Sequence, residues 1–488
     1  MVKKRGILFV NPGGTRKRVY QKLDRDYSAV EPPFFAALTA SFIRNKGFDV
    51  DILDANAENL TIEESAGKIE EKNPELVNII VYGQHPSAST QLMTGVGALC
   101  REIKKENKKR KIILTGLHPS ALPEKTIKEE ECDYVGEGEG FHTILGILEK
   151  EILSGIEGLW YKQDGKILHN ERAPLIRNLS EELSDVAWDL LPWGKYKAHN
   201  WHCLHDLESR ESYASISTSL GCPFNCSFCC ISAPFGKRVY REFSPEWVLK
   251  QIDALVQKHN VKNIKFIDEL FVLNPKHFVP ICEGLIERDY NLNIWAYARV
   301  DTTKERYLEL LKKAGVNWLA FGFEAANEKV MKEVSKSQFS REDVKKIRER
   351  VGKAGINVIG NYIFGLPEDT IESMQETLNL ALELNCEFAN FYCATAYPGS
   401  QLYEDAVKNN LSLPDSWEKY AQHHYEFLPL DTRYVSRKDV LEFRDKAFIK
   451  YFTNQKYLEM IERKFGDKAR EHIEEMTKIN LERKLLCD

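Results

Sequence analysis

Short apolar runs and longer stretches of helical periodicity alternate over the first 150 residues. The apolar runs are nearly continuous, which is typical of strands buried on both faces of a parallel sheet. We predict a helix over 34–45 and strands at 6–10, 48–53, 76–81, 111–115 and 133–135. This alternation predicts an α/β domain with a doubly wound parallel sheet over residues 1–150. Glycines gather after the third, fourth and fifth runs, at the sheet edge where ligands bind.

The same alternation resumes near residue 213. Apolar runs, each followed by a helical stretch, occur at 213–219, 263–268, 294–298, 318–323, 358–364 and 388–394. Ser244 and Pro245 form an N-cap and first-turn proline that begin the first of these helices. Six βα units predict a partial (β/α)6 barrel over 211–400, with its chemistry at the carboxyl ends of the strands. We interpret 151–210 as a connector containing a hairpin near 160–168, and 401–488 as a helical C-terminal domain.

Composition narrows the possible classes of protein. The 488 residues indicate two or three domains, and 43% hydrophobic with 29% charged residues is a globular balance. The net charge of −5 gives no reason to expect a nucleic-acid partner. No apolar run approaches the roughly 20 residues that cross a bilayer, and the run at 7–10 is shorter than the about 7–15 residues of a signal peptide. We therefore expect a cytoplasmic protein without a transmembrane segment.

Three of the eleven cysteines lie close together, directly after the first strand of the second region. Cys222, Cys226 and Cys229 have the spacing CxxxCxxC. Three thiolates on a 4Fe–4S cubane leave one iron open, as a catalytic metal site requires. The alternative is a zinc loop, whose fourth ligand could come from Cys230, Cys203, His202 or His205. The position after a strand and the aromatic Phe228 favour the cluster, and we expect Cys230 to be a small buried residue.

This motif resembles the radical S-adenosylmethionine (SAM) signature CxxxCxΦC, with Phe228 as the aromatic residue. The resemblance implies that the open iron binds SAM, and that an external donor such as flavodoxin or ferredoxin supplies the electron that cleaves SAM to a 5′-deoxyadenosyl radical. It also implies contacts with SAM from Phe228, Asp268, Glu269, Arg299, Glu324, Asn361 and Ile363. Two structural alternatives remain: Arg299 and Glu324 could pair with each other, and the adjacent acids 268 and 269 could cap the following helix.

The first domain is similar to the cobalamin-binding members of that superfamily. The similarity rests on 11–13, 81–84, the GxHPSALP segment at 116–123, the GEGE segment at 136–139, and the connector segments 177–180 and 190–193. It implies cobalamin contacts from Asn11, Pro12, Tyr82, Gly83, Gln84, Ser87, Thr115, Gly116, Leu117, His118, Gly136, Glu137 and Gly138. The alternatives are a sheet that binds a nucleotide or the substrate, or one that binds nothing.

The DxHxxG loop that places a histidine below cobalt in mutase-type domains is missing from residues 1–150. We therefore expect cobalamin without a histidine on its lower face, and we interpret His118 as a residue that shapes its loop. Glycines at the strand ends are expected to let the backbone approach a flat ligand.

Together these features predict a cobalamin-dependent radical SAM enzyme that methylates an unactivated carbon or phosphorus of an unknown substrate, a small molecule, lipid or peptide. In this hypothesis methylcobalamin supplies the methyl group and a second SAM restores it. One alternative is a ring-forming or rearranging enzyme with the same cofactors but no methyl transfer, and another is a non-enzymatic Fe–S and cobalamin sensor. No acid or base can be assigned. The adjacent His423 and His424 could reach the site, but we expect them at the surface.

Overall fold

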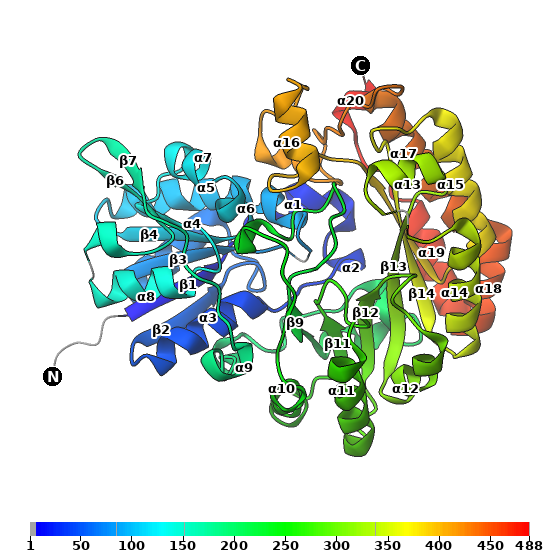
Figure 1. Ribbon diagram of the computed structural model, residues 1–488, viewed down its shortest axis with the longest axis horizontal. Helices are drawn as coiled ribbons and strands as arrows, with labels where there is room; N and C mark the ends of the chain where they lie inside the picture. Colours follow the sequence, from blue (N-terminus) through cyan, green and yellow to red (C-terminus); the bar gives the residue numbers. More distant parts are fainter. Residues whose placement is uncertain (1–5, 84, 151, 337, 488) are drawn as a thin grey trace.

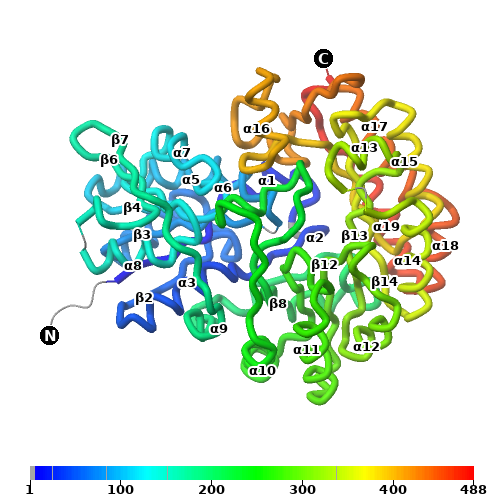
Figure 2. Tube along the Cα trace, in the orientation of Figure 1, coloured from blue at the N-terminus to red at the C-terminus, as the bar shows by residue number. Residues whose placement is uncertain are grey.

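The computed structural model describes residues 6–83, 85–150, 152–336 and 338–487. The chain forms two lobes side by side, an N-terminal lobe drawn in blue and cyan and a larger lobe drawn from green to red (Figure 1). The trace in Figure 2 shows that the helical C-terminus packs on the outside of the second lobe. Among the described residues, no helix combines the length and apolar character needed to cross a bilayer.

The N-terminal lobe is built on a seven-stranded sheet in the order β2-β1-β3-β4-β5-β6-β7. Its strands are β1 (Gly6–Asn11), β2 (Asp49–Asp54), β3 (Leu76–Val81), β4 (Lys111–Gly116), β5 (Tyr134–Gly136), β6 (Leu159–Gln163) and β7 (Lys166–His169). The first five are parallel, as the continuous apolar runs predicted, and β6 and β7 add antiparallel. The hairpin predicted in the connector therefore belongs to this sheet, because β6 pairs with the short strand β5.

Helices cover both faces of this sheet. They are α3 (Phe34–Asn45), α4 (Ile62–Lys72), α5 (Ala88–Glu106), α6 (Leu117–Ala121), α7 (Pro123–Glu129) and α8 (Phe141–Glu149). The strand order reverses between β1 and β3, so the loops that follow these two strands diverge and leave a crevice. That crevice faces the second lobe.

The second lobe contains a six-stranded parallel sheet in the order β15-β14-β13-β12-β11-β8. Its strands are β8 (Tyr213–Ile216), β11 (Asn263–Phe266), β12 (Asn293–Ala298), β13 (Val316–Glu324), β14 (Asn357–Phe364) and β15 (Phe388–Cys393). The crossover helices are α10 (Pro245–His259), α11 (Pro275–Arg288), α12 (Leu308–Lys313), α13 (Glu328–Glu333), α14 (Arg341–Lys353) and α15 (Ile371–Leu384). Since β8 and β15 are not paired, the barrel is open on one side.

The first predicted strand of this lobe is interrupted. It divides into β8 and the two-residue β9 (Ser219–Leu220), which pairs antiparallel with β10 (Arg241–Glu242). The break occurs because the backbone N–H of Thr218 donates to the carboxylate of Asp268 instead of continuing the ladder. The chain is thereby turned toward the cysteine loop.

Segments from both ends of the chain pack around the barrel. From the N-terminus come α1 (Arg16–Tyr20), η1 (Gln21–Leu23) and α2 (Asp24–Tyr27); from the C-terminus come α16 (Gln401–Lys408), α17 (Arg437–Phe452), α18 (Gln455–Phe465), α19 (Asp467–Thr477) and α20 (Lys484–Cys487). The two groups touch: Gln21 donates to the carbonyl oxygen of His423 at 2.6 Å, and the ring of Tyr27 stacks on that of His472 with centroids 5.0 Å apart.

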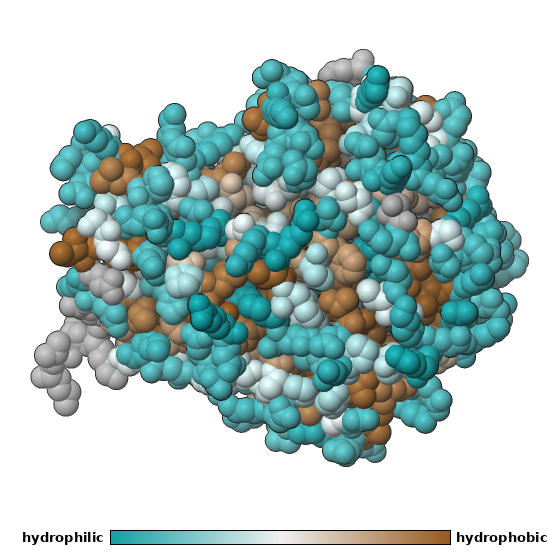
Figure 3. Space-filling model, viewed as in Figure 1, coloured by the Kyte–Doolittle hydropathy of each residue, from teal (hydrophilic) through white to brown (hydrophobic). Residues whose placement is uncertain are grey.

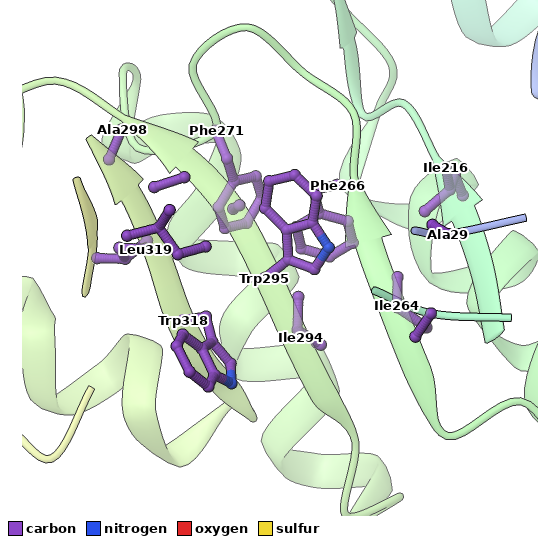
Figure 4. Packing of buried hydrophobic residues seen from close by; sticks show 14 of the residues in the cluster. Ala29, Ile216, Ile264, Phe266, Phe271, Ile294, Trp295, Ala298, Trp318 and Leu319 are labelled. Atoms are coloured by element: carbon purple, nitrogen blue, oxygen red, sulfur yellow. The ribbon is translucent and has the colours of Figure 1, made fainter. Parts of the chain in front are cut away.

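The core of the barrel is rich in large aromatic side chains. Figure 4 shows Trp295 on β12 and Trp318 on β13 among buried aliphatic residues. On the surface in Figure 3, hydrophilic residues predominate and hydrophobic ones show through near the middle, where the lobes meet. Burial of the apolar side chains in the core is the main stabilising contribution to the fold.

Candidate active site

The three clustered cysteines lie on the loop that follows β9. The loop turns at Gly221, whose φ of 86° suits glycine and where a Cβ would collide with the carbonyl oxygen of Val239. Cys222, Cys226 and Cys229 are half-buried free thiols that line one cavity of about 250 Å³, the cluster cavity. Burial raises the pKa of Cys222 to about 12 and that of Cys229 well above its usual value. Cluster binding would therefore have to release protons from these thiols.

The three thiols have the composition expected of a cluster site. Among the described residues, no three His, Cys, Asp or Glu side chains are gathered into a site for one metal ion. Three cysteine ligands on a cubane each bind a different iron and leave the fourth iron open. The donor set of three cysteines around one cavity fits the predicted cluster.

Three of the other zinc ligands considered above lie elsewhere. His202 and Cys203 contact Asn293 and Asn263, which begin β12 and β11 at the amino ends of the strands, opposite the cysteine loop. The ring of His205 packs on Phe465. Cys230, by contrast, lines the cluster cavity with the three motif cysteines; it is buried, as predicted, and burial raises its pKa to about 12.

The two acids after β11 have different surroundings. Asp268 is fully buried and accepts hydrogen bonds from the Thr218 hydroxyl at 2.7 Å and the Ser219 hydroxyl at 2.6 Å, so it anchors the strand that leads to the cysteines. Glu269 lines the cluster cavity, and burial raises its pKa to about 7. Neither caps the next helix, because α11 has Asn274 as its N-cap. Glu269 is thus the acid available to an ammonium group.

Arg299 and Glu324 both line the cluster cavity but do not pair with each other. Arg299 forms an ion pair with Asp301 at 2.9 Å, lies over the ring of Phe224 at 3.8 Å, and approaches the thiol sulfur of Cys226 at 3.9 Å. A guanidinium in this position is suited to stabilise a thiolate or a nearby carboxylate.

Glu324 pairs with Lys336, and both side chains are buried. The backbone of Glu324 has a φ of 56°, at an irregularity in the pairing of β13 with β14. Left-handed backbone at a non-glycine residue is uncommon and here aims the carboxylate into the cavity. Sequence reasoning missed Lys336, since nothing in the pattern marked a lysine twelve residues beyond the acid.

The remaining predicted SAM contacts, Phe228, Asn361 and Ile363, also line the cluster cavity. The ammonium of Lys336 lies over the ring of Phe228, 6.0 Å from its centroid. All the predicted SAM residues except Asp268 therefore meet around one cavity, which combines apolar walls with acids and two cations, a composition that fits SAM.

A second cavity, of about 150 Å³, lies between the lobes and is called here the interlobe cavity. Its wall includes Asn11, Pro12, Tyr82, Gly83 and Leu117 from the predicted cobalamin set, at the crevice beside β1 and β3. Gln84 lies outside the described residues, and Ser87 lines the cluster cavity instead. The largely apolar walls and position at the switch point suit a flat, bulky cofactor.

Other residues of the predicted cobalamin set are held by protein contacts away from that wall. Thr115 donates to Asn78 at 2.9 Å, Glu137 accepts from Trp160 at 2.7 Å, and the backbone N–H of Gly138 donates to Ser120 at 3.1 Å. Gly136 packs against the side chain of Thr115. These assignments stay predictions.

His118 and the strand-end glycines have structural roles in the lobe. The buried ring of His118 contacts the Thr90 hydroxyl and lies edge-on to Trp417, which agrees with its interpretation as a loop-shaping residue. At Gly83 and Gly116 an added Cβ would meet the backbone of Ala88 and Val81 at 2.5 Å. A side chain at either position would therefore collide with neighbouring backbone, while the expectation that these glycines let the backbone approach a ligand stays a prediction.

A third cavity lies deeper in the barrel, and no sequence pattern marked it. His85 lines all three cavities, so it stands where they meet. His423 lines the third cavity and His424 is buried, so their predicted surface location is wrong. The segment that carries them is drawn inward by contacts with Gln21 and Arg483.

Residues 216–381 match the Radical SAM superfamily, and residues 26–148 match the B12 binding domain. The chain is 31% identical over 432 residues to an uncharacterized methyltransferase of Pyrococcus horikoshii, covering 88% of this chain and 89% of that protein. It is 26% identical over 476 residues to an anaerobic magnesium-protoporphyrin IX monomethyl ester cyclase of Rubrivivax gelatinosus, covering 92% and 80%.

Among solved structures, the radical SAM methyltransferase TsrM of Kitasatospora setae has the same fold. The TM-score is 0.69 at 16% identity, covering 97% of this chain and 99% of that one. The two domain matches fall on the two lobes, and a relative of more than 30% identity spans most of the chain. This protein therefore belongs to the cobalamin-dependent radical SAM superfamily, enzymes that use a 4Fe–4S cluster, SAM and cobalamin.

Proposed function

We propose that this enzyme transfers a methyl group to a substrate carbon or phosphorus. The observation that carries the proposal is the junction of the cavities: the cluster cavity and the interlobe cavity share His85, Pro86 and Glu269. A methylation of this type needs one substrate atom to be reached from the adenosyl group and from cobalt, so the two cofactor cavities must meet. The relative named as a methyltransferase supports the same reaction.

When bound, the cluster and SAM supply a radical, and cobalamin supplies the methyl group. The residues of this chain hold and orient those groups. Glu269 would accept the SAM ammonium, and Arg299 would stabilise the thiolate of Cys226 and the SAM carboxylate. Glu324 would accept the ribose hydroxyls once Lys336 shifts aside.

The best test needs no substrate. The protein is reconstituted anaerobically with iron, sulfide and cob(I)alamin, then incubated with SAM that carries ¹³C in its methyl group. We expect ¹³C-methylated cobalamin, and 5′-deoxyadenosine after addition of dithionite. Formation of 5′-deoxyadenosine without labelled cobalamin would contradict methyl transfer and favour the ring-forming alternative, represented by the Rubrivivax cyclase. Absence of both products would favour the sensor hypothesis.

We also propose a small acidic electron carrier, flavodoxin or ferredoxin, as the reductant, and the cytoplasm as the location. All eleven cysteines are free thiols in the structure, which fits a reducing compartment. Reduced flavodoxin in place of dithionite should sustain 5′-deoxyadenosine formation. If it does not, the proposed reductant is refuted.

A further inference from the structure

The third cavity is a deep chamber in the barrel, here called the inner chamber. Its volume is about 170 Å³, and its wall includes Ile359 and Ala389 on β14 and β15. It shares Tyr297, Asn361 and Tyr392 with the cluster cavity, and His85 with both cofactor cavities. A group held in the chamber would therefore lie beside both cofactors.

Aromatic rings form much of the wall of the inner chamber. They come from the barrel strands, the N-terminal segment, the connector and the C-terminal helices: Tyr20, Tyr27, Trp201, Trp295, Tyr297, Phe388, Phe391, Tyr392, Tyr397 and Phe448. Trp201 lies edge-on to Trp295 with centroids 5.1 Å apart, so these rings brace one another. Packed aromatic rings favour flat ligands. The wall also carries neutral amides that can pair with uncharged polar groups of a ligand: Gln91, Asn200, Asn361, Asn390 and Gln422.

The permanent charges on the wall are already neutralised. Lys265 is paired with Glu31, with its ammonium nitrogen 2.9 Å from the carboxylate. Arg444 donates to the carbonyl oxygen of Phe391 at 2.8 Å and to Asp445 at 2.7 Å. A charged ligand would lose its hydration in the chamber and find its natural counter-ions already occupied.

The histidines of the wall add no charge. Burial lowers the pKa of His85 to about 4 and that of His199 to about 3, and it lowers the pKa of His423 well below its usual value. His199 is also fixed by its contact with the carbonyl oxygen of Tyr27 at 3.1 Å. At neutral pH these rings are uncharged and add polarity without attracting an ion.

We propose, building on the proposed methyl transfer, that the inner chamber holds the reacting part of the substrate, and that this part is a flat, uncharged group. The rest of the substrate can extend toward the interlobe cavity, whose wall shares Tyr20 and Gln91 with the chamber. The specificity of the enzyme then lies in the shape and neutrality of the chamber wall.

The test compares neutral and charged probes of matched shape. Dissociation constants of the reconstituted holoenzyme are measured by calorimetry for indole-3-carboxamide and 1-naphthamide, and for indole-3-carboxylate and 1-naphthoate. We expect the neutral probe of each pair to bind at least tenfold more tightly. Equal or tighter binding of the carboxylates would overturn the neutrality of the site.

Variants locate the binding in the chamber. Ala389→Val and Ile359→Phe narrow the chamber without touching the cluster cavity, and we expect each to weaken 1-naphthamide binding at least fivefold. Ala381→Val, at a buried position in α15 away from the chamber, is the matched control. Circular dichroism and iron content report folding, and unchanged 1-naphthamide binding in either folded chamber variant would refute the assignment. These binding measurements stand apart from the cobalamin-labelling test, so the two proposals can fail separately.

Discussion

The buried ion pair between Lys265 and Glu31 offers a sharp test of how the lobes are joined. Lys265 belongs to β11 of the barrel, and Glu31 belongs to the N-terminal lobe just before α3. Their side chains are only 3% and 9% exposed. At the observed 2.9 Å, Coulomb's law with an effective dielectric constant of about 20 gives roughly 6 kcal/mol of attraction. Desolvation of the two charges opposes much of this attraction.

Removing one partner leaves the other charge buried and uncompensated. We expect Lys265→Met to lower the free energy of unfolding by about 3–5 kcal/mol, and Glu31→Gln to lower it similarly. The double variant should regain most of the loss, because no uncompensated charge is left. Urea unfolding followed by tryptophan fluorescence measures all four proteins.

An exposed pair is the matched control. Lys150 and Glu75 lie 3.6 Å apart with side chains 60% and 45% exposed, so Lys150→Met should change stability by less than about 0.5 kcal/mol. Two results would refute the reasoning. One is that Lys265→Met lowers the free energy of unfolding by less than about 1 kcal/mol. The other is that the double variant loses as much stability as the two single variants together.

Three further predictions concern the cluster, the SAM pocket and pH. Cys229→Ala should lose most of the iron after reconstitution, whereas Cys230→Ala should keep it; equal iron contents would contradict the ligand assignment. Gly322→Ala places a Cβ against the buried carboxylate–ammonium pair and should weaken SAM binding in equilibrium dialysis at least tenfold, whereas Gly155→Ala, with open space around it, should not. Burial raises the pKa of Glu130 to about 7, so the folded protein loses stability as pH rises from about 4.5 to 7. Glu130→Gln should therefore raise the urea midpoint of unfolding at pH 8 and leave it nearly unchanged at pH 4. The opposite trend would refute this reasoning.

The strands were predictable because each is a continuous apolar run between polar boundaries. The run at 76–81 coincides with β3, and the helix predicted over 34–45 coincides with α3. Local signals of this kind suffice where a strand is buried on both faces. They failed at 213–219, because the break there depends on the carboxylate of Asp268, fifty residues away in the chain.

The candidate site was predictable only where a short sequence motif indicates its chemistry. The cysteine spacing marked the cluster loop, and the family resemblance marked Glu269, Arg299 and Glu324, which the fold brings to one cavity. The inner chamber could not be predicted, since its wall is assembled from strands, connector and both chain ends. Ordinary core aromatics and cavity-lining aromatics have the same sequence pattern, and only the fold separates them.

The contact of Gln21 with the carbonyl oxygen of His423 and with Glu482 has a consequence for synthesis of the chain. His423 lies 402 residues after Gln21 in the sequence, and Glu482 lies 461 residues after it. Segments that leave the ribosome first must wait for the last ones before the barrel is closed. The N-terminal lobe can fold early, but the chamber wall exists only after translation is nearly complete. Phe448 and Met476 are the last parts of that wall to be made, so the inner chamber is completed later in synthesis than the cavity around the cluster loop, whose wall ends at Gln422.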